Sequence, residues 1–115
     1  MLRKSPSRAD RRQGSHAPVF AALGDDTRLS LVARLANGRR HSISQLAAGS
    51  QFTRQAITKH LHVLEGAGIV HSVRAGRESL FALDPQPIQE VAAYLDLVSK
   101  EWDMALERLK NLVGA

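Results

Sequence analysis

The sequence of 115 residues contains no cysteine, which excludes disulfide bonds and thiolate metal sites. Aromatic residues are also scarce, with three Phe, one Tyr and one Trp. So few rings argue against a platform that stacks the bases of single-stranded nucleic acid. The sequence has neither the apolar run of a signal peptide nor the roughly 20 apolar residues of a membrane span. We therefore expect a cytoplasmic protein without a membrane partner.

Sequence motifs of enzymes are missing as well. There is no glycine-rich phosphate loop, no nucleophile elbow and no pair of carboxylates suited to acid–base chemistry. The adjacent Asp25 and Asp26 are better interpreted as a helix cap. We expect the protein not to be an enzyme and to need no cofactor.

Basic charge is distributed unevenly along the chain. Residues 1–16 carry five basic side chains and one acidic, residues 17–83 eight and four, and residues 84–115 three and six. The first two segments are therefore suited to a polyanion and the last is not. Residues 1–16 lack periodic apolar positions, which predicts a disordered basic tail. The remainder, 17–115, is long enough for one domain.

Capping residues and apolar periodicity predict four helices in the first half of the domain. A short helix ends at Gly24, and Asp25 is the N-cap of the second. Ser42 or Ser44 can cap the third, and Thr53 is a suitable N-cap for the fourth.

After the fourth helix the apolar period changes towards two. Strands at 70–75 and 79–83 flank Gly76-Arg77, a pattern typical of a type II′ hairpin. A long amphipathic helix follows at about 87–113. The sequence thus predicts a mainly α fold with a small β-hairpin, in the order α-α-α-α-β-β-α, which is a winged helix-turn-helix.

The helix predicted at 53–66 has two different faces. Ile57, Leu61 and Leu64 recur at i, i+4 and i+7 and are expected to face the core. The opposite face carries Arg54, Gln55, Thr58, Lys59 and His62. Gln and Arg can bond adenine and guanine edges, and Lys suits a phosphate. An ordinary solvated helix has a similar composition, but the stretch from 52 to 64 lacks any acidic residue, which favours DNA.

Further groups extend this basic surface. Thr53 lies at the start of the helix, where backbone amides can hold a phosphate. Arg74 and Arg77 lie in the hairpin, and Arg77 at its tip could reach a neighbouring minor groove or the DNA backbone. A protein-interaction module built on the same fold is the alternative, and these basic side chains argue against it.

Three stretches of this sequence resemble ArsR-type (arsenic-repressor-like) winged-helix regulators. Residues 53–64, continued by 67–70, resemble the recognition helix of that family, residues 22–28 its opening and residues 76–83 its wing. The resemblance covers about residues 18–112 and implies a homodimer that binds an operator in double-stranded DNA, usually as a repressor. It places at or near the DNA the residues Gln55, Ala56, Thr58, Lys59 and His60.

The sequence departs from the family at two places. Gln51 stands where the turn before the recognition helix usually has Gly, and Ser42 and Ser44 stand where metal sensors have a Cys-x-Cys motif. Serine hydroxyls are poor ligands for soft metals, so we expect no metal site. His60 is expected to be partly buried and hydrogen-bonded. An effector, if there is one, is then an unidentified small molecule.

The C-terminal helix predicts a dimer. Its apolar positions follow alternating steps of three and four, close to a heptad seam, over roughly 37 Å. Such a seam calls for a partner helix, although it could instead cover only its own domain. A two-fold dimer would favour an inverted-repeat operator. The residues expected at the dimer interface are Val19, Phe20, Leu23, Val91, Leu95, Val98, Trp102, Leu106 and Leu109.

Overall fold

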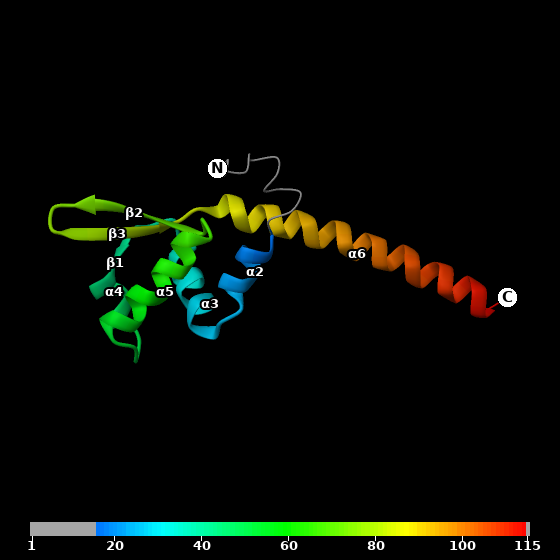
Figure 1. Cartoon of the computed structure of the whole chain (residues 1–115), viewed down its shortest axis with the longest axis horizontal. Helices are drawn as coiled ribbons and strands as arrows, with labels where there is room; N and C mark the ends of the chain where they lie inside the picture. Colours follow the sequence, from blue (N-terminus) through cyan, green and yellow to red (C-terminus); the bar gives the residue numbers. More distant parts are fainter. Residues whose placement is uncertain (1–15, 115) are drawn as a thin grey trace, which may run out of the picture.

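The computed structural model describes residues 16–114, so the tail predicted for 1–16 lies outside the described residues except for His16. A helical domain carries a small antiparallel sheet on one side, and one long helix projects from it (Figure 1). The elements in chain order are α2 (Ala17–Leu23), α3 (Asp26–Leu35), β1 (His41–Ser42), α4 (Ile43–Ala48), α5 (Arg54–Gly66), β2 (Val70–Ala75), β3 (Glu78–Leu83) and α6 (Pro85–Gly114). The winged helix-turn-helix expected from the sequence is confirmed.

Polar side chains begin the three helices that follow α2. The Asp25 carboxylate accepts from the Arg28 amide at 3.0 Å, and the Thr53 hydroxyl accepts from the Ala56 amide at 3.1 Å, as predicted. For α4 the structure decides between the two candidates. Ser42 is the N-cap, because its hydroxyl accepts from the Gln45 amide while the Gln45 side chain accepts from the Ser42 amide.

The sheet has three strands in the order β1-β3-β2, one more than the predicted hairpin. His41 pairs with Phe81, and Ser42 pairs with Leu80. The sequence predicted no strand between the second and third helices, so β1 was missed. A strand of two residues is too short to show an alternation of apolar and polar residues in the sequence. It forms because it pairs with β3.

The β2–β3 hairpin turns within two residues. Ala75 pairs with Glu78, and Gly76 has φ 63°. Among residues 16–114 only glycines have a positive φ, so Arg77, the second residue of the turn, has a negative one. A positive φ at the first central position alone agrees with the predicted type II′ turn. Gln51 likewise needs no left-handed backbone, so the turn before α5 tolerates a residue with a side chain there.

Helix α6 begins at Pro85, two residues earlier than predicted. Pro85 and Pro87 both lie in its first turn, where a missing amide proton costs no hydrogen bond. The Asp84 carboxylate accepts from the Gln86 amide at 3.0 Å and so satisfies one of the exposed donors. None of the described helices is long and apolar enough to cross a membrane.

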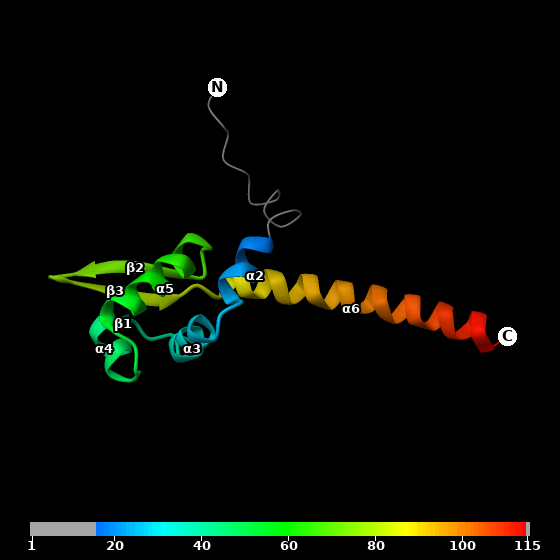
Figure 2. The same ribbon diagram turned by 60° about the horizontal axis from the view of Figure 1, so that its bottom comes forward.

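The core lies between the helices and the inner side of the sheet. Its fully buried side chains come from α3, α4, α5 and the start of β2: Leu35, Leu46, Ile57, Leu61, Leu64, Ile69 and Val70. The other buried core residues are Val19 and Ala22 of α2, Leu31 of α3, Phe81 of β3 and Val91 of α6. Figure 2 shows α2 beside the first turns of α6, and the remainder of α6 leaves the domain. Helix α5 is therefore held from one side, and its other side faces outward.

Candidate nucleic-acid interface

Helix α5 is anchored by its apolar stripe. Ile57, Leu61 and Leu64 are all buried, as predicted from their spacing, and the helix packs on α2, α3 and α4. Burying three large aliphatic side chains in this way stabilises the domain by several kcal/mol. The stripe fixes the rotation of the helix about its axis, so it also determines which side chains face outward.

The outward face of α5 is basic and polar. Arg54, Gln55, Lys59 and His62 are exposed, and Ala56 and Thr58 are half-buried. The hydroxyl of Thr58 donates to the Arg54 carbonyl at 2.7 Å, so its proton is already used within the helix. Thr58 therefore presents its methyl group and an accepting oxygen. The predicted polar face exists, with one hydroxyl less available as a donor than the sequence suggested.

His60 lies on the inner side of the same helix. Its Nδ1 is 3.2 Å from a guanidinium nitrogen of Arg28 and 3.8 Å from the Asp25 carboxylate, and its side chain is 23% exposed. A guanidinium can only donate, so neutral His60 accepts at Nδ1 and carries its proton on Nε2. The expectation of a partly buried, hydrogen-bonded histidine is confirmed. Its contact is with the junction of α2 and α3.

Arg28 and Asp25 hold this junction together. The Arg28 guanidinium donates to the Ala22 carbonyl at 2.6 Å, at the end of α2. The hydrogen bond from the Arg28 amide lowers the pKa of the Asp25 carboxyl, against a smaller opposing effect of burial. The positive charge of the Arg28 guanidinium lowers it further. The sequence predicted Asp25 as a cap but gave no signal for its contact with α5.

The hairpin carries the second group of predicted residues. Past Val70 every residue of β2 is exposed, so the hairpin projects from the domain (Figure 1). Arg74 is exposed and pairs with Ser79, and Arg77 is in the two-residue turn. The Ser72 hydroxyl donates to the Glu65 carboxylate at 2.9 Å and ties the hairpin to α5. This hydrogen bond holds the base of the hairpin against the C-terminal end of α5.

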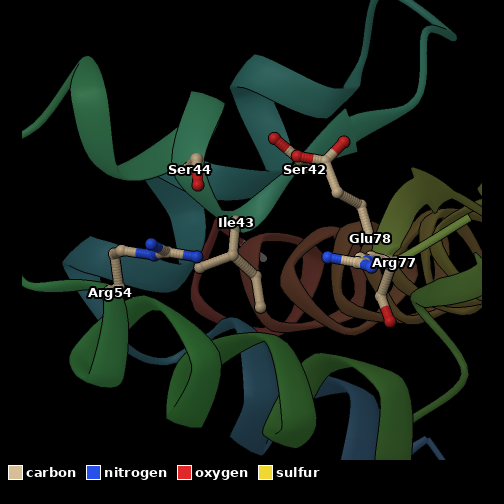
Figure 3. A pocket seen from close by; sticks show the side chains of 7 residues that line it. Ser42, Ile43, Ser44, Arg54, Arg77 and Glu78 are labelled. Carbon is tan, nitrogen blue, oxygen red and sulfur yellow. The ribbon is translucent and has the colours of Figure 1, made fainter.

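The structure brings two of the predicted arginines to one place. Arg54 of α5 and Arg77 of the turn line a common pocket with residues of α4 and β3 (Figure 3). The pocket also includes Ser44 and Ser79, which the sequence did not indicate as binding residues. Ser44 was considered only as a lost metal ligand. In the described part of the chain no cluster of three or more His, Asp or Glu side chains could hold a metal ion.

The residues predicted for a dimer interface divide into two groups. Val19 and Val91 are buried in the chain's own core, so they offer little surface to a partner, and Leu23 packs against that core. Phe20 is partly exposed, with its ring 6.3 Å from that of Tyr94. The others lie on α6, where Val98 is half-buried and the exposed residues are Leu95, Trp102, Leu106 and Leu109.

Comparison with known proteins agrees with this geometry. A family model described as a helix-turn-helix domain matches residues 23–73. The HTH-type transcriptional regulator Rv2034 of Mycobacterium tuberculosis is 32% identical over 97 residues, which cover 84% of this chain and 87% of that protein. The HTH-type regulator YuzN of Bacillus subtilis is 33% identical over 84 residues, which cover 68% of this chain and 91% of that protein. A solved structure of an ArsR-like transcriptional regulator from Rhodococcus sp. RHA1 has 37% identity and a TM-score of 0.75, covering 84% and 91% of the two chains.

Proposed function

Because the chain belongs to the ArsR family of winged helix-turn-helix transcription regulators, we propose that it binds an inverted-repeat operator as a homodimer. As a member of that family it is a DNA-binding regulator and not an enzyme. The observation that carries the proposal is the outward face of α5. It presents Arg54, Gln55 and Lys59 from a helix whose other face is fully buried.

In the proposed complex α5 enters the major groove by its N-terminal half. Gln55 and Arg54 lie in the first turn, where side chains of a recognition helix reach base edges. Gln55 suits adenine and Arg54 suits guanine, while Lys59 one turn later binds a backbone phosphate. Arg77 at the tip of the wing contacts the flanking DNA. Bound at a promoter, such a protein blocks transcription, so we infer a repressor.

The homodimer is proposed from the exposed apolar side of α6. From Tyr94 onwards the helix leaves the domain for roughly 30 Å at 1.5 Å per residue. Leu95 is 50% exposed and Trp102 is 64% exposed on this segment. Large exposed apolar faces of this kind mark interaction sites, and a second copy of the helix provides a matching seam. A two-fold axis there places two α5 helices for an inverted repeat.

Selection of bound sequences from a random DNA pool tests the proposal. We expect an enriched inverted repeat with half-sites about one helical turn apart. Fluorescence anisotropy on that sequence should give a steep loss of affinity with salt. If each protomer neutralises three phosphates, the slope of log K against log salt is about −5 for the dimer.

Two substitutions separate the proposed roles. Gln55→Ala should reduce the preference for one base pair in each half-site, and Lys59→Ala should weaken binding to all sequences and reduce the salt slope by about two per dimer. Lys100→Ala is the matched control, because it removes the same charge from α6, where Lys100 pairs only with Asp96 at 3.1 Å. An unenriched pool would contradict specific binding and favour a protein-interaction module. Equal loss of affinity on all sequences in both variants would refute the role of Gln55.

A further inference from the structure

A pocket of about 200 Å³ lies where α4, the start of α5 and the tip of the hairpin meet. It is smaller than the 300–1,000 Å³ typical of sites for drug-sized ligands, so any occupant is small. Its wall has two guanidinium groups and several hydroxyls, with a single carboxylate. The lining residues are Ser42, Ile43, Ser44, Arg54, Arg77, Glu78 and Ser79.

The two arginines approach the pocket from opposite sides. In Figure 3 the side chains of Arg54 and Arg77 point toward each other across Ile43, and the Glu78 carboxylate is turned toward Ser42. Ion pairs in the described part of the chain join His60 to Asp25 and Lys100 to Asp96, and neither pocket arginine takes part in one. Two cations facing one carboxylate leave the pocket with a net positive charge, which fits an anionic ligand.

The hydroxyls provide neutral donors beside the two cations. Ser42 is buried and its oxygen already accepts from the Gln45 amide, so it is the least available. Ser44 is exposed on α4, and Ser79 is half-buried on β3. Neither hydroxyl has a hydrogen bond among the described residues. Both can therefore turn their protons toward a ligand.

We propose that this pocket is a binding site for a phosphate group. A guanidinium matches two phosphate oxygens with parallel N–H bonds, and two such groups on opposite sides can hold a tetrahedral dianion. Ser44 and Ser79 would donate to its remaining oxygens. A volume of about 200 Å³ also leaves room for a small organic part over Ile43, as in a small phosphomonoester. The same group could come from a free molecule or from the backbone of DNA.

Competition between these two sources is a consequence that rests on the proposed function. Arg54 and Arg77 are the residues proposed to meet DNA from α5 and from the wing. A free phosphomonoester in the pocket would occupy both guanidiniums and reduce the affinity for the operator. The site itself does not depend on DNA binding and can be examined without DNA.

The direct test is an NMR titration of the whole protein with inorganic phosphate and with glycerol 3-phosphate, without DNA and at constant ionic strength. We expect saturable shifts of backbone amides that are confined to the pocket residues. Replacing both Ser44 and Ser79 by Ala should weaken binding about a hundredfold, since each lost hydrogen bond to a charged group costs about tenfold. Ser99→Ala is the control for the serines, because Ser99 is exposed on α6.

Glu78→Gln tests the sign of the electrostatic argument. Removing a negative charge near the ligand should tighten phosphate binding about threefold. Glu107→Gln makes the same change in net charge at an exposed position on α6 and should leave binding unchanged. Equal effects of the two variants would show that only the net charge of the protein matters, and would refute a specific phosphate site in the pocket.

Anisotropy with the selected operator then identifies the source. If glycerol 3-phosphate binds the pocket and releases DNA from the wild type more readily than from the double serine variant, the site serves a free ligand. If free phosphate does not bind but the double serine variant loses operator affinity at an unchanged salt slope, the site holds the DNA backbone, since neutral hydroxyls release no counterions. If neither is seen while the operator still binds, the phosphate site is refuted and the proposed function stands.

Discussion

The Arg34 side chain binds the last turn of α4, close to Gly49. The Arg34 guanidinium donates to the carbonyls of Leu46 and Gln45, which lie at the C-terminal end of α4. A Cβ added at Gly49 would lie 2.8 Å from one guanidinium nitrogen and 3.1 Å from its carbon. Gly49 has φ −92°, so an alanine is compatible with the backbone there. In the folded state Gly49→Ala should therefore act only by moving Arg34 off the carbonyls.

The magnitude follows from these contacts. Hydrogen bonds from a cation contribute about 1.5–3 kcal/mol when buried, and one of these two is exposed, so Arg34→Met should cost about 2 kcal/mol. Gly49→Ala should lose about half of that and regain about 0.5 kcal/mol from the stiffer unfolded chain. We expect a net loss of roughly 0.5 kcal/mol in the wild type. Once Arg34 is Met, Gly49→Ala should instead stabilise by about 0.5 kcal/mol.

Urea unfolding followed by far-UV circular dichroism measures all four members of this cycle. The protomer concentration must be equal throughout, because association would shift the apparent stability. Gly66→Ala is the control, since its Cβ meets nothing within 4 Å and should stabilise in either background. Changes that are additive within about 0.5 kcal/mol would refute the coupling of Gly49 and Arg34.

Two further predictions concern the junction at Asp25 and the exposed part of α6. The pKa of Asp25 is lowered in the folded state, so its contribution to stability is present above the ordinary carboxyl pKa and is lost as pH falls through the folded value. Asp25→Asn should flatten the stability profile below the ordinary carboxyl pKa of about 4, and an unchanged profile would contradict this. Trp102→Glu should shift the sedimenting species from dimer to monomer. Lys100→Glu, which adds negative charge elsewhere on the same helix, should not, and a dimer that survives Trp102→Glu would refute the proposed seam.

The parts of the fold that were predictable have signals within a few residues. Asp25 and Thr53 cap helices through contacts three positions away, and both caps were recognised in the sequence. The stripe of α5 and the Gly76 turn are equally local. Ser42 and Ser44 could not be distinguished, because both can cap and only pairing of β1 with β3 fixes where α4 begins.

The sequence predicted which side chains of α5 face outward, but not which side chains of other elements lie next to them. Burial of one side of α5 requires the other to be exposed, so Gln55 and Lys59 were identified correctly as outward residues. The contact of His60 with Arg28 spans 32 positions in the sequence. The pocket that brings Arg54 near Arg77 is lined by residues of β1, α4, α5 and β3. Periodicity and capping patterns cannot predict contacts between residues so far apart in the sequence, because these contacts depend on how the helices and the sheet pack together.

The apolar stripe of α6 was also predictable only in part, because the sequence does not show which of its residues the chain itself buries. Periodicity marks Val91 and Leu95 alike as seam positions, but Val91 is 4% exposed and Leu95 is 50% exposed. The difference arises because α2 and the core reach only the first turns of α6. In the proposed homodimer the partner covers the stripe from Tyr94 onwards, beside the ring of Phe20. A second copy joined there would continue the core of each protomer, so the spacing between two α5 helices would be set by the same packing that holds each one in place.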